Sequence, residues 1–228
     1  MGTLYLVSTP IGNLGDISLR AIEILKAVDL ILCEDTRKTA NLLQKLTGRQ
    51  GCQLISFYEE NEESKIPRAI ELLRQGAKIA LVSNAGTPLI SDPGFKLVRE
   101  VVRHGIRLEA VPGPSAVMTA LAVSGLPTDR FMFVGFLPKK EIKLQTILKK
   151  LPVKTTIVFF ESPYRLLATL KEIQKCCGDI TLVICREMTK VHEEVRREKV
   201  SEAIDHFQKT KPLGEFTCLF YLSENREG

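Results

Sequence analysis

The stretch Lys78–Gly94, KIALVSNAGTPLISDPG, begins as an apolar run, continues as a loop of small residues and ends where a helix is expected. This order is typical of α/β proteins that bind phosphate at a helix N-terminus. The loop contains no Lys, so its backbone groups, small side chains and Thr87 hydroxyl suit an uncharged heterocycle, a ribose or a zwitterion better than a triphosphate. Asp92 followed by Pro93 predicts an N-cap and first turn, and thus a helix that ends at His104.

The same alternation of apolar strands and amphipathic helices continues through the first half of the chain. The expected strands are Leu4–Ser8, Leu30–Cys33, Gln53–Phe57, Lys78–Ser83 and Ile106–Val111, and the other expected helices begin near Ser18, follow Thr36 and span Glu63–Gln75. Such alternation predicts a mostly parallel sheet covered by helices on both faces. Ligands of these sheets bind at the carboxyl ends of strands, so the loops after four of the strands are expected at one edge. These loops follow Ser8, Cys33, Ser83 and Val111.

Turn-forming residues at Ser124–Asp129 predict a boundary between two α/β domains, an N-terminal domain at 1–125 and a C-terminal domain at 126–228. The strands expected in the second domain are Phe131–Phe136, Thr156–Phe160, Thr181–Cys185, Val195–Val200 and Phe216–Leu222, with helices around Lys143–Lys150, Tyr164–Cys176 and Glu202–Lys209. The link from Cys185 to Val195 is too short for a parallel crossover, so a mixed or antiparallel sheet is expected there.

Charge, apolar runs and cysteine spacing indicate which partners and sites the chain can have. The 228 residues carry a net charge of +5, with the basic excess mainly in the second half, which permits a polyanionic partner. Met1–Val7 lacks the features of a secretory signal and no apolar run is long enough to span a bilayer, so a cytoplasmic protein without a membrane partner is expected. The six cysteines are scattered without zinc-site spacing and the three histidines are isolated, which favours buried reduced thiols and no metal.

Several loops contain residues that a simple connector does not need. Gly12 and Gly15 do not form a GxGxxG fingerprint, so a nicotinamide cofactor is not expected. Pro112–Ala116 is a stiff turn leading into a helix, whose free N–H groups either donate to a ligand or only begin the helix. Glu161–Arg165 and Arg186–Lys190 place charges at strand ends, where they either line a cleft or form exposed salt bridges worth about 0 to 1 kcal/mol. The basic pairs Lys139–Lys140, Lys149–Lys150 and Arg196–Arg197 are most often solvated faces, and are only candidate phosphate contacts.

Eight ordered segments carry a resemblance to a known family: LYLVSTPIGNLGDISLRA, CEDTRKTANLL, SNAGTPLISDPG, VPGPSAVMTAL, GFLPKK, FFESPYRL, REMTKVHEE and GEF. From Leu4 to about Leu222, the chain resembles the bacterial small-subunit ribosomal RNA methyltransferases that modify a cytidine 2′-hydroxyl in the decoding centre, within the tetrapyrrole-methylase superfamily. The resemblance implies a two-domain, homodimeric α/β methylase that binds S-adenosylmethionine in the cleft between its domains. Its implied partner is small-subunit (16S) ribosomal RNA or the 30S particle.

Carried over residue by residue, the resemblance implies a cofactor pocket. Its residues are Pro10, Ile11, Gly86, Thr87, Pro88, Leu89, Ile90, Ser115, Ala116, Ser162, Glu187 and Gly214. Thr87 stands where many superfamily members have Asp, and either contacts the cofactor or shapes the turn. Two departures concern RNA: Glu141–Leu144 interrupts the basic residues that normally follow GFLPKK, and the family commonly extends beyond the position of Gly228. RNA docking is therefore expected to use fewer residues here.

Methylation of a ribose hydroxyl requires removal of its proton, so a general base is expected within hydrogen-bond reach. The candidates are Glu34, Asp35, Glu161, Glu187 and Lys190, with Arg37 or Arg186 to anchor a phosphate. Two alternatives stay open at this stage. One is a methyltransferase of the same fold that acts on a precorrin-type tetrapyrrole, and the other is a non-catalytic module that senses the cofactor, for which Thr87 in place of Asp is the motive.

Overall fold

The computed structural model describes residues 1–48 and 52–224, which form two compact units that divide between Ser115 and Ala116. The division falls before helix α5, Ala116–Ser124, whereas the sequence indicated a boundary after residue 125. The reason is that α5 packs against strands of the second unit. Residues 49–51 and 225–228, which the predicted domains include, lie outside the described residues.

Five parallel strands form the sheet of the first unit, in the order β3-β2-β4-β1-β5. They are β1 Thr3–Val7, β2 Leu30–Cys33, β3 Gln53–Ser56, β4 Lys78–Val82 and β5 Arg107–Val111. Strand β2 and residues 79–82 of β4 are continuous apolar runs, as expected for strands that are buried on both faces. The predicted parallel sheet is confirmed.

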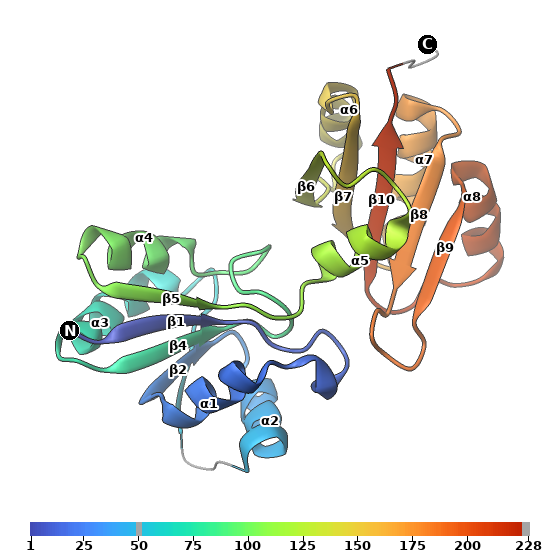
Figure 1. The fold of residues 1–228 in the computed structure, drawn as a ribbon. Helices are drawn as coiled ribbons and strands as arrows, with labels where there is room; N and C mark the ends of the chain where they lie inside the picture. Colours follow the sequence, from blue (N-terminus) through green and yellow to red (C-terminus); the bar gives the residue numbers. More distant parts are fainter. Residues whose placement is uncertain (49–51, 225–228) are drawn as a thin grey trace. The chain divides into compact units, whose positions relative to one another are not determined.

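Helices cover both faces of this sheet. They are α1 Leu19–Ala27, α2 Thr36–Thr47, α3 Glu62–Arg74 and α4 Phe95–Arg103, with a short 3₁₀ helix at Leu14–Asp16. Figure 1 shows α1 and α2 on one face and α3 and α4 on the other. Successive residues of a strand point to opposite faces, so Leu30 and Leu32 join the core under α3 and α4, whereas Ile31 and Cys33 join the core under α1 and α2.

Helix α4 begins later than predicted. Its first residue is Phe95, and its N-cap is Gly94, whose φ of +124° lies in the region that favours glycine. The prediction that Asp92 caps this helix is therefore wrong. The physical reason is that the preceding loop adopts left-handed backbone at Leu89 (φ 73°) and Ser91 (φ 67°), which delays the helical path until after Gly94.

The sheet of the second unit is mixed, in the order β6-β7-β10-β8-β9. Its strands are β6 Phe131–Phe136, β7 Thr155–Glu161, β8 Thr181–Arg186, β9 Glu194–Lys199 and β10 Phe216–Leu222. Strands β6 and β7 are parallel, whereas β10 is antiparallel to β7 and β8, and β9 is antiparallel to β8. The short link between β8 and β9 thus has the antiparallel geometry predicted for it.

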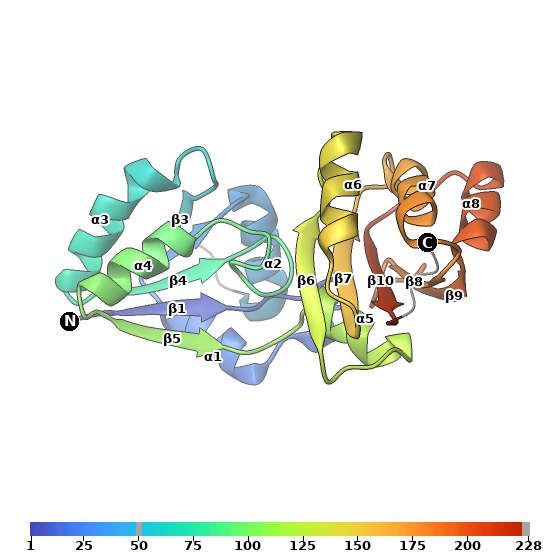
Figure 2. The same cartoon turned by 90° about the horizontal axis from the view of Figure 1, so that it is seen from above.

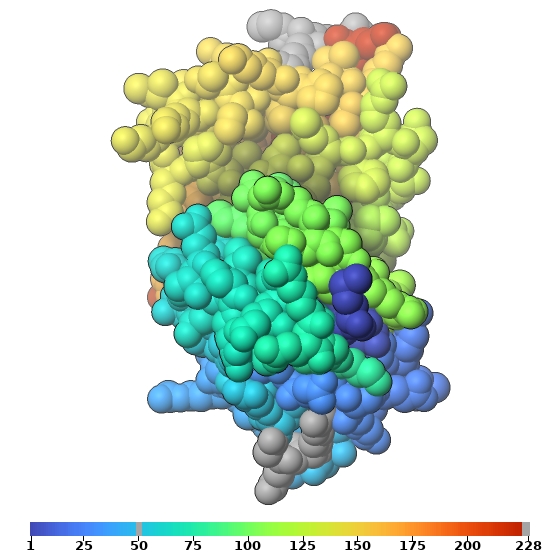
Figure 3. Space-filling model, turned by 90° about the vertical axis from the view of Figure 1, so that its left-hand side faces the viewer, coloured from blue at the N-terminus to red at the C-terminus, as the bar shows by residue number. Residues whose placement is uncertain are grey.

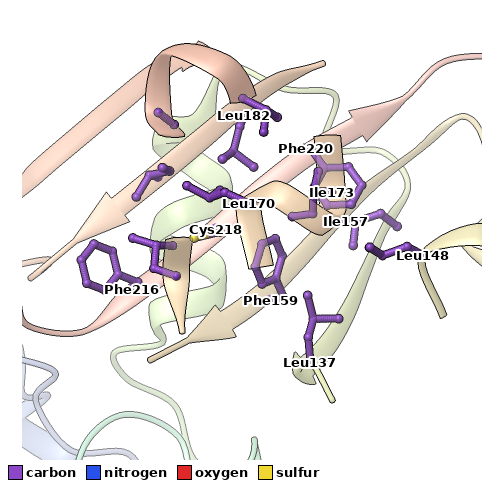
Figure 4. Close-up of a cluster of buried hydrophobic side chains, with 14 of the residues drawn as sticks. Leu137, Leu148, Ile157, Phe159, Leu170, Ile173, Leu182, Phe216, Cys218 and Phe220 are labelled. Atoms are coloured by element: carbon purple, nitrogen blue, oxygen red, sulfur yellow. The ribbon is translucent and has the colours of Figure 1, made fainter. Parts of the chain in front are cut away.

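Three helices cover one face of the second sheet and α5 lies on the other face, as Figures 1 and 2 show. The three are α6 Glu141–Lys150, α7 Leu166–Cys177 and α8 Val200–Lys209. Figure 4 shows the core between these helices and the sheet, where Phe159 and Phe220 meet edge to face with ring centroids 6.0 Å apart. Burial in this core raises the pKa of the Cys218 thiol well above its usual value, which keeps that thiol protonated. Within residues 1–48 and 52–224, no helix has the length and apolar character to cross a membrane.

Candidate functional site

The loops that the sequence predicted at one sheet edge do meet there in the first unit. Because the strands are parallel, the segments after β1, β2, β4 and β5 leave the sheet at the same edge. Thr9 and Gly86 exchange two backbone hydrogen bonds, of 2.9 and 3.0 Å. The Thr9 hydroxyl also donates to the Ser83 carbonyl over 3.4 Å. The loops after β1 and β4 are therefore held together as one surface.

Gly86 lies where backbone conformation and available space both favour glycine. Its φ is +81°, and a Cβ there would stand 3.3 Å from Ile11 Cγ2 and 3.7 Å from the Pro114 carbonyl oxygen. Ile11 and Pro10 belong to the loop after β1, and Pro114 belongs to the loop after β5. The space beside the predicted pocket residue Gly86 is therefore bounded by Ile11, another predicted pocket residue, and a side chain at position 86 would crowd it.

The Thr87 hydroxyl connects three loops. It accepts a hydrogen bond from the Ser8 hydroxyl over 3.1 Å and donates one to the Pro114 carbonyl over 3.1 Å. Both of its hydrogen-bonding roles are therefore used to hold the loops after β1, β4 and β5 together. Of the two roles left open by the sequence, shaping the turn is the one that these contacts display.

The residues after Thr87 differ in their exposure. Pro88 is buried, and Leu89 packs against the core under α3 and α4. Ile90 is 42% exposed, so its side chain is available at the surface of the loop. Ser115, the last residue of the first unit, is half-buried. The predicted pocket residues of the first unit thus lie on three neighbouring loops of one sheet edge.

Two carboxylates from other elements fix the ends of the Ser83–Gly94 loop. Glu34, at the end of β2, accepts a hydrogen bond from the Asn84 N–H over 3.0 Å. Glu62, at the start of α3, accepts one from the Gly94 N–H over 3.1 Å and pairs with Lys96 over 3.2 Å. Sequence reasoning missed Glu62, because its partner lies 32 positions further along the chain and no local pattern marks the pair.

A third carboxyl, that of Asp92, belongs to this loop itself and is partly buried. Burial and, to a smaller extent, the charge of Glu34 raise the pKa of Asp92, a hydrogen bond with Ser83 lowers it, and the result is a pKa of about 6. Asp92 therefore changes its protonation near neutral pH.

Asp35 and Arg37 have local roles at the start of α2. The Asp35 carboxylate accepts hydrogen bonds from the backbone N–H groups of Arg37 and Lys38, over 2.9 and 3.2 Å, and so caps the helix. The hydrogen bond from Lys38, followed by the one from Arg37, lowers the pKa of Asp35 below its usual value. The Arg37 side chain is exposed. Helix capping thus explains Asp35 without a catalytic role, although its role as a base stays a prediction.

In the second unit, strand register gathers the remaining predicted residues at one edge. Phe216, the first residue of β10, lies opposite both Glu161 and Arg186, the last residues of β7 and β8. The segments that follow β7 and β8 and the segment that precedes β10 therefore share this edge. They contain Ser162, Glu187, Lys190 and Gly214, while Ala116 begins α5.

Glu187 is the centre of a polar cluster at this edge. Its Oε1 atom accepts hydrogen bonds from Lys190 Nζ and from the Glu215 N–H, both over 2.9 Å. Lys190 Nζ also pairs with Glu215 Oε2 over 2.9 Å. A Cβ at Gly214 would stand 2.6 Å from Glu187 Cγ, and the φ of Gly214 is +94°. Glu187, Lys190 and Gly214, each predicted from the sequence, thus form one contact group.

The charges of this group stabilise each other. Burial disfavours the ionised form of Glu187, but hydrogen bonds from Lys190 and from the Glu215 backbone outweigh it, so the pKa of Glu187 is lowered. Burial likewise disfavours the charged form of Lys190, but hydrogen bonds to Glu187 and Glu215 outweigh it and raise its pKa. Glu187 is therefore an anion and Lys190 a cation at neutral pH.

Glu161 has an internal role instead. Its side chain is fully buried, and its carboxylate accepts hydrogen bonds from Thr169 Oγ1 over 2.5 Å and from the Ser162 N–H over 2.7 Å. Arg165 lies 3.5 Å from the same carboxylate and donates from Nη2 to the carbonyls of Leu137 and Pro138. A carboxylate enclosed in this way does not reach a substrate, so the structure removes Glu161 from the candidate bases. Arg186, a candidate phosphate anchor, pairs with Glu194 over 3.0 Å.

A groove of about 480 Å³ lies between α3 and α4 of the first unit. Figure 3 shows the surfaces of these helices, teal and green, next to each other. The groove is lined by Glu63, Ile66, Pro67, Ile70, Arg74, Lys96, Arg99, Glu100 and His104. It contains none of the residues predicted for the site.

The two edges offer different chemistry. The first presents backbone groups, the Thr87 hydroxyl and the carboxyls of Glu34 and Asp92, which suits the hydrogen-bonding groups of a nucleoside. The second presents an ionised carboxylate paired with a lysine. Within residues 1–48 and 52–224, no three His, Cys, Asp or Glu side chains are placed to hold a metal ion.

Residues 3–204 match the model of a family described as tetrapyrrole (corrin/porphyrin) methylases. The chain is 52% identical over 219 residues to the ribosomal RNA small subunit methyltransferase I of Thermotoga maritima, which covers 96% of this chain and 98% of that protein. It is 44% identical over 224 residues to the protein of the same name from a Hydrogenobaculum species, covering 97% and 96% of the two chains.

Solved structures share the fold at lower identity. A cobalt precorrin-4 methyltransferase, a cobalamin biosynthetic enzyme, has a TM-score of 0.70 at 21% identity, covering 96% of this chain and 94% of that one. A uroporphyrin-III C-methyltransferase from Thermus thermophilus, complexed with S-adenosyl homocysteine, has a TM-score of 0.63 at 19% identity, covering 96% and 97%. The predicted two-sheet α/β fold is thereby confirmed.

Proposed function

The chain belongs to the tetrapyrrole (corrin/porphyrin) methylase family, and from that membership we propose that it transfers a methyl group from S-adenosylmethionine to a cytidine 2′-hydroxyl of small-subunit ribosomal RNA. The observation that carries the proposal is the identity of 52% over nearly the full length of a relative named for methylation of this RNA. The choice of cytidine and of the 2′-oxygen rests on the eight sequence segments.

The first sheet edge fits the proposed cofactor. S-adenosylmethionine supplies an electrophilic methyl group on a sulfonium, and its nucleoside needs hydrogen bonds and close backbone approach rather than a phosphate-binding cation. Gly86 leaves room beside Ile11, and Thr87 fixes the loop through Ser8 and Pro114. The exposed Ile90 offers an apolar contact. We propose that the loops after β1, β4 and β5 hold the cofactor.

The main catalytic contribution of the protein is then alignment. Displacement at a methyl carbon needs the attacking oxygen in line at about 3 to 3.5 Å, a geometry that rigid loops can preserve. The attacking ribose hydroxyl also has to lose its proton. Among the predicted bases, Glu34 and Asp35 accept hydrogen bonds from backbone N–H groups. Glu187, by contrast, is also paired with the Lys190 ammonium, which keeps it ionised. We therefore propose Glu187 as the residue that orients this hydroxyl and accepts its proton.

Lys190 supports the proposed role of Glu187 as the proton acceptor. Its ammonium lies 2.9 Å from Glu187 Oε1 and keeps the carboxylate ionised. Because Lys190 is itself protonated, it serves as a cation toward the RNA backbone and not as a base. Gly214 lets the β10 segment approach Glu187 closely enough for the Glu215 N–H to fix the same oxygen.

Methyl incorporation into unmodified small subunits is the test. Labelled cofactor should modify a single cytidine, and subunits reconstituted with a 2′-deoxy nucleotide at that position should incorporate no label. Incorporation that persists on the deoxy substrate contradicts the 2′-oxygen as acceptor. Labelling that disappears when a precorrin competes would instead point to a tetrapyrrole substrate. The predicted homodimer and cytoplasmic location stay predictions.

A further inference from the structure

An exposed aromatic residue stands at the charged edge of the second unit without a structural reason. Tyr164, which follows β7, is 91% exposed. Its side chain therefore contributes almost no buried apolar area to folding. The neighbouring Arg165, by contrast, is half-buried and makes several hydrogen bonds. The fold holds the backbone at this point while leaving the tyrosine ring in solvent.

Arg165 joins this turn to the end of β6. Its Nη2 atom donates to the Leu137 carbonyl over 2.7 Å and to the Pro138 carbonyl over 3.2 Å. Phe136, immediately before those residues, is 56% exposed, and its ring lies 5.6 Å from that of Phe160 in β7. A second exposed aromatic thus belongs to the same corner of the sheet, and both are attached to a backbone that internal hydrogen bonds make rigid.

Two lysines follow Phe136 closely in the sequence. Lys139 and Lys140 come after Pro138, and both are exposed. Neither makes a salt bridge to the part of the chain that the structure describes, whereas Lys190 and Arg186 at the same edge are paired with glutamates. Exposed lysines beside exposed aromatic rings match the chemistry of unpaired nucleic acid, whose bases stack on aromatic rings and whose phosphates attract cations.

We propose that Tyr164, Phe136, Lys139 and Lys140 form a docking surface for unpaired RNA, with a base stacked on Tyr164 and the adjoining phosphates against the two lysines. This inference rests on the proposed function, because it assigns the substrate contacts of the same enzyme. It commits to an RNA strand as occupant because exposed aromatic rings next to exposed lysines match the bases and the phosphates of one strand.

Binding of wild-type protein and variants to a small-subunit RNA fragment tests the surface. Tyr164→Ala should weaken binding roughly 5- to 100-fold, the range of one base–aromatic stack, whereas Tyr164→Phe should stay within about threefold of wild type. Lys139→Ala with Lys140→Ala should reduce the slope of log affinity against log salt by about 1 to 2. The matched control is Lys149→Ala with Lys150→Ala at the C-terminal end of α6. It should change the RNA affinity and the salt slope less than Lys139→Ala with Lys140→Ala does.

Calorimetry with S-adenosylhomocysteine and sedimentation separate the remaining outcomes. Each variant should bind this cofactor product as wild type does, which excludes misfolding as the cause. If wild type methylates the small subunit and Tyr164→Ala does so with equal KM, the inference is overturned and the proposed function stands. If Tyr164 governs RNA affinity but no methyl is transferred, the inference stands and the proposed function fails. A change in self-association with unchanged RNA affinity would overturn the inference by making this surface a contact between two copies.

Discussion

The buried carboxylate of Glu62 accepts a hydrogen bond from the backbone N–H of Gly94, the N-cap of α4, over 3.1 Å. Gly94 has no side chain with which to cap that helix, so a residue of α3 provides both the acceptor and a negative charge at the positive end of α4. Lys96, in the first turn of α4, lies 3.2 Å from the same carboxylate. The exit of the Ser83–Gly94 loop is therefore fixed by a different helix.

Replacing Glu62 with Ala should lower the free energy of unfolding by about 1 to 3 kcal/mol, because a buried N–H and an ammonium lose their acceptor. It should also weaken the binding of S-adenosylhomocysteine, since the loop would no longer have a fixed end. Urea unfolding and calorimetry measure the two effects. Glu63→Ala is the matched control, because Glu63 pairs with the same Lys96 but is exposed and has no hydrogen bond to Gly94. Equal behaviour of the two variants would contradict this role for Glu62.

Asp92→Asn should stabilise the protein at pH 8 but not at pH 4. Burial raises the pKa of Asp92 in the folded state to about 6, above its value of 3.8 in a free chain, so the folded protein holds this proton more tightly than the unfolded chain does. Ionisation therefore costs stability as pH rises from about 4 to 6, and because solvent screens this partly exposed carboxyl, we expect a cost on the order of 1 to 2 kcal/mol. Asn carries no charge at either pH and avoids this loss.

The free energy of unfolding at the two pH values, compared between Asp92→Asn and wild type, checks the sign. Asp129→Asn, at an exposed position, is the control substitution. A difference between Asp92→Asn and wild type that is the same at pH 4 and pH 8 would disprove the account.

Gly214→Ala should reduce methyl transfer at least about tenfold. The added Cβ would come within 2.6 Å of Glu187 Cγ, and displacing Glu187 by even a fraction of an ångström disturbs in-line geometry. Gly178→Ala is the control that separates backbone strain from the displacement of Glu187. Gly178 has a similar φ of +80°, but a Cβ there meets nothing within 4 Å. Both variants should lose about 1 to 2 kcal/mol of stability through backbone strain, and only Gly214→Ala should also lose activity. Similar activity losses would assign the effect to strain alone.

Thr87→Val should lower stability by about 1 to 2 kcal/mol, because it removes the hydroxyl between Ser8 and the Pro114 carbonyl. The loops after β1 and β5 would then separate from the β4 loop, and cofactor affinity should fall with stability. Thr87→Ser retains the hydroxyl and should keep both properties near wild type. Thermal unfolding and calorimetry on the two variants provide the comparison, and a Ser variant as impaired as the Val variant would show that the methyl group matters instead.

The spacing of apolar residues predicted nearly every strand and helix, because the residues of one element are close together in the sequence. Leu30–Cys33 and Phe216–Leu222, for example, form strands at the predicted bounds. The family resemblance assigned Glu187 and Gly214 to the cofactor pocket, and Lys190 was a candidate base; the structure brings these three residues together, while their roles stay predictions. The misses concern features that local sequence patterns do not reveal, which are the packing of one element on another and the backbone conformation of a loop.

Glu161 illustrates such a miss, since a carboxylate at a strand end is read as exposed until the helix that covers it is known. Its Thr169 partner belongs to α7, and only packing shows that the pair is buried. The predicted start of α4 at Asp92 is a second miss. The pair Asp92–Pro93 satisfies every local rule for a helix start, but the left-handed residues before it carry the chain past that position.

The hydrogen bonds that hold the Ser83–Gly94 loop have a consequence for its motion. The amides of Asn84, Gly86 and Gly94 donate to acceptors in three other segments of the first unit. Their exchange with solvent deuterium requires several of these segments to open together, so it should proceed as slowly as that of the strands. A stretch without regular secondary structure would thus rank among the most protected parts of its unit.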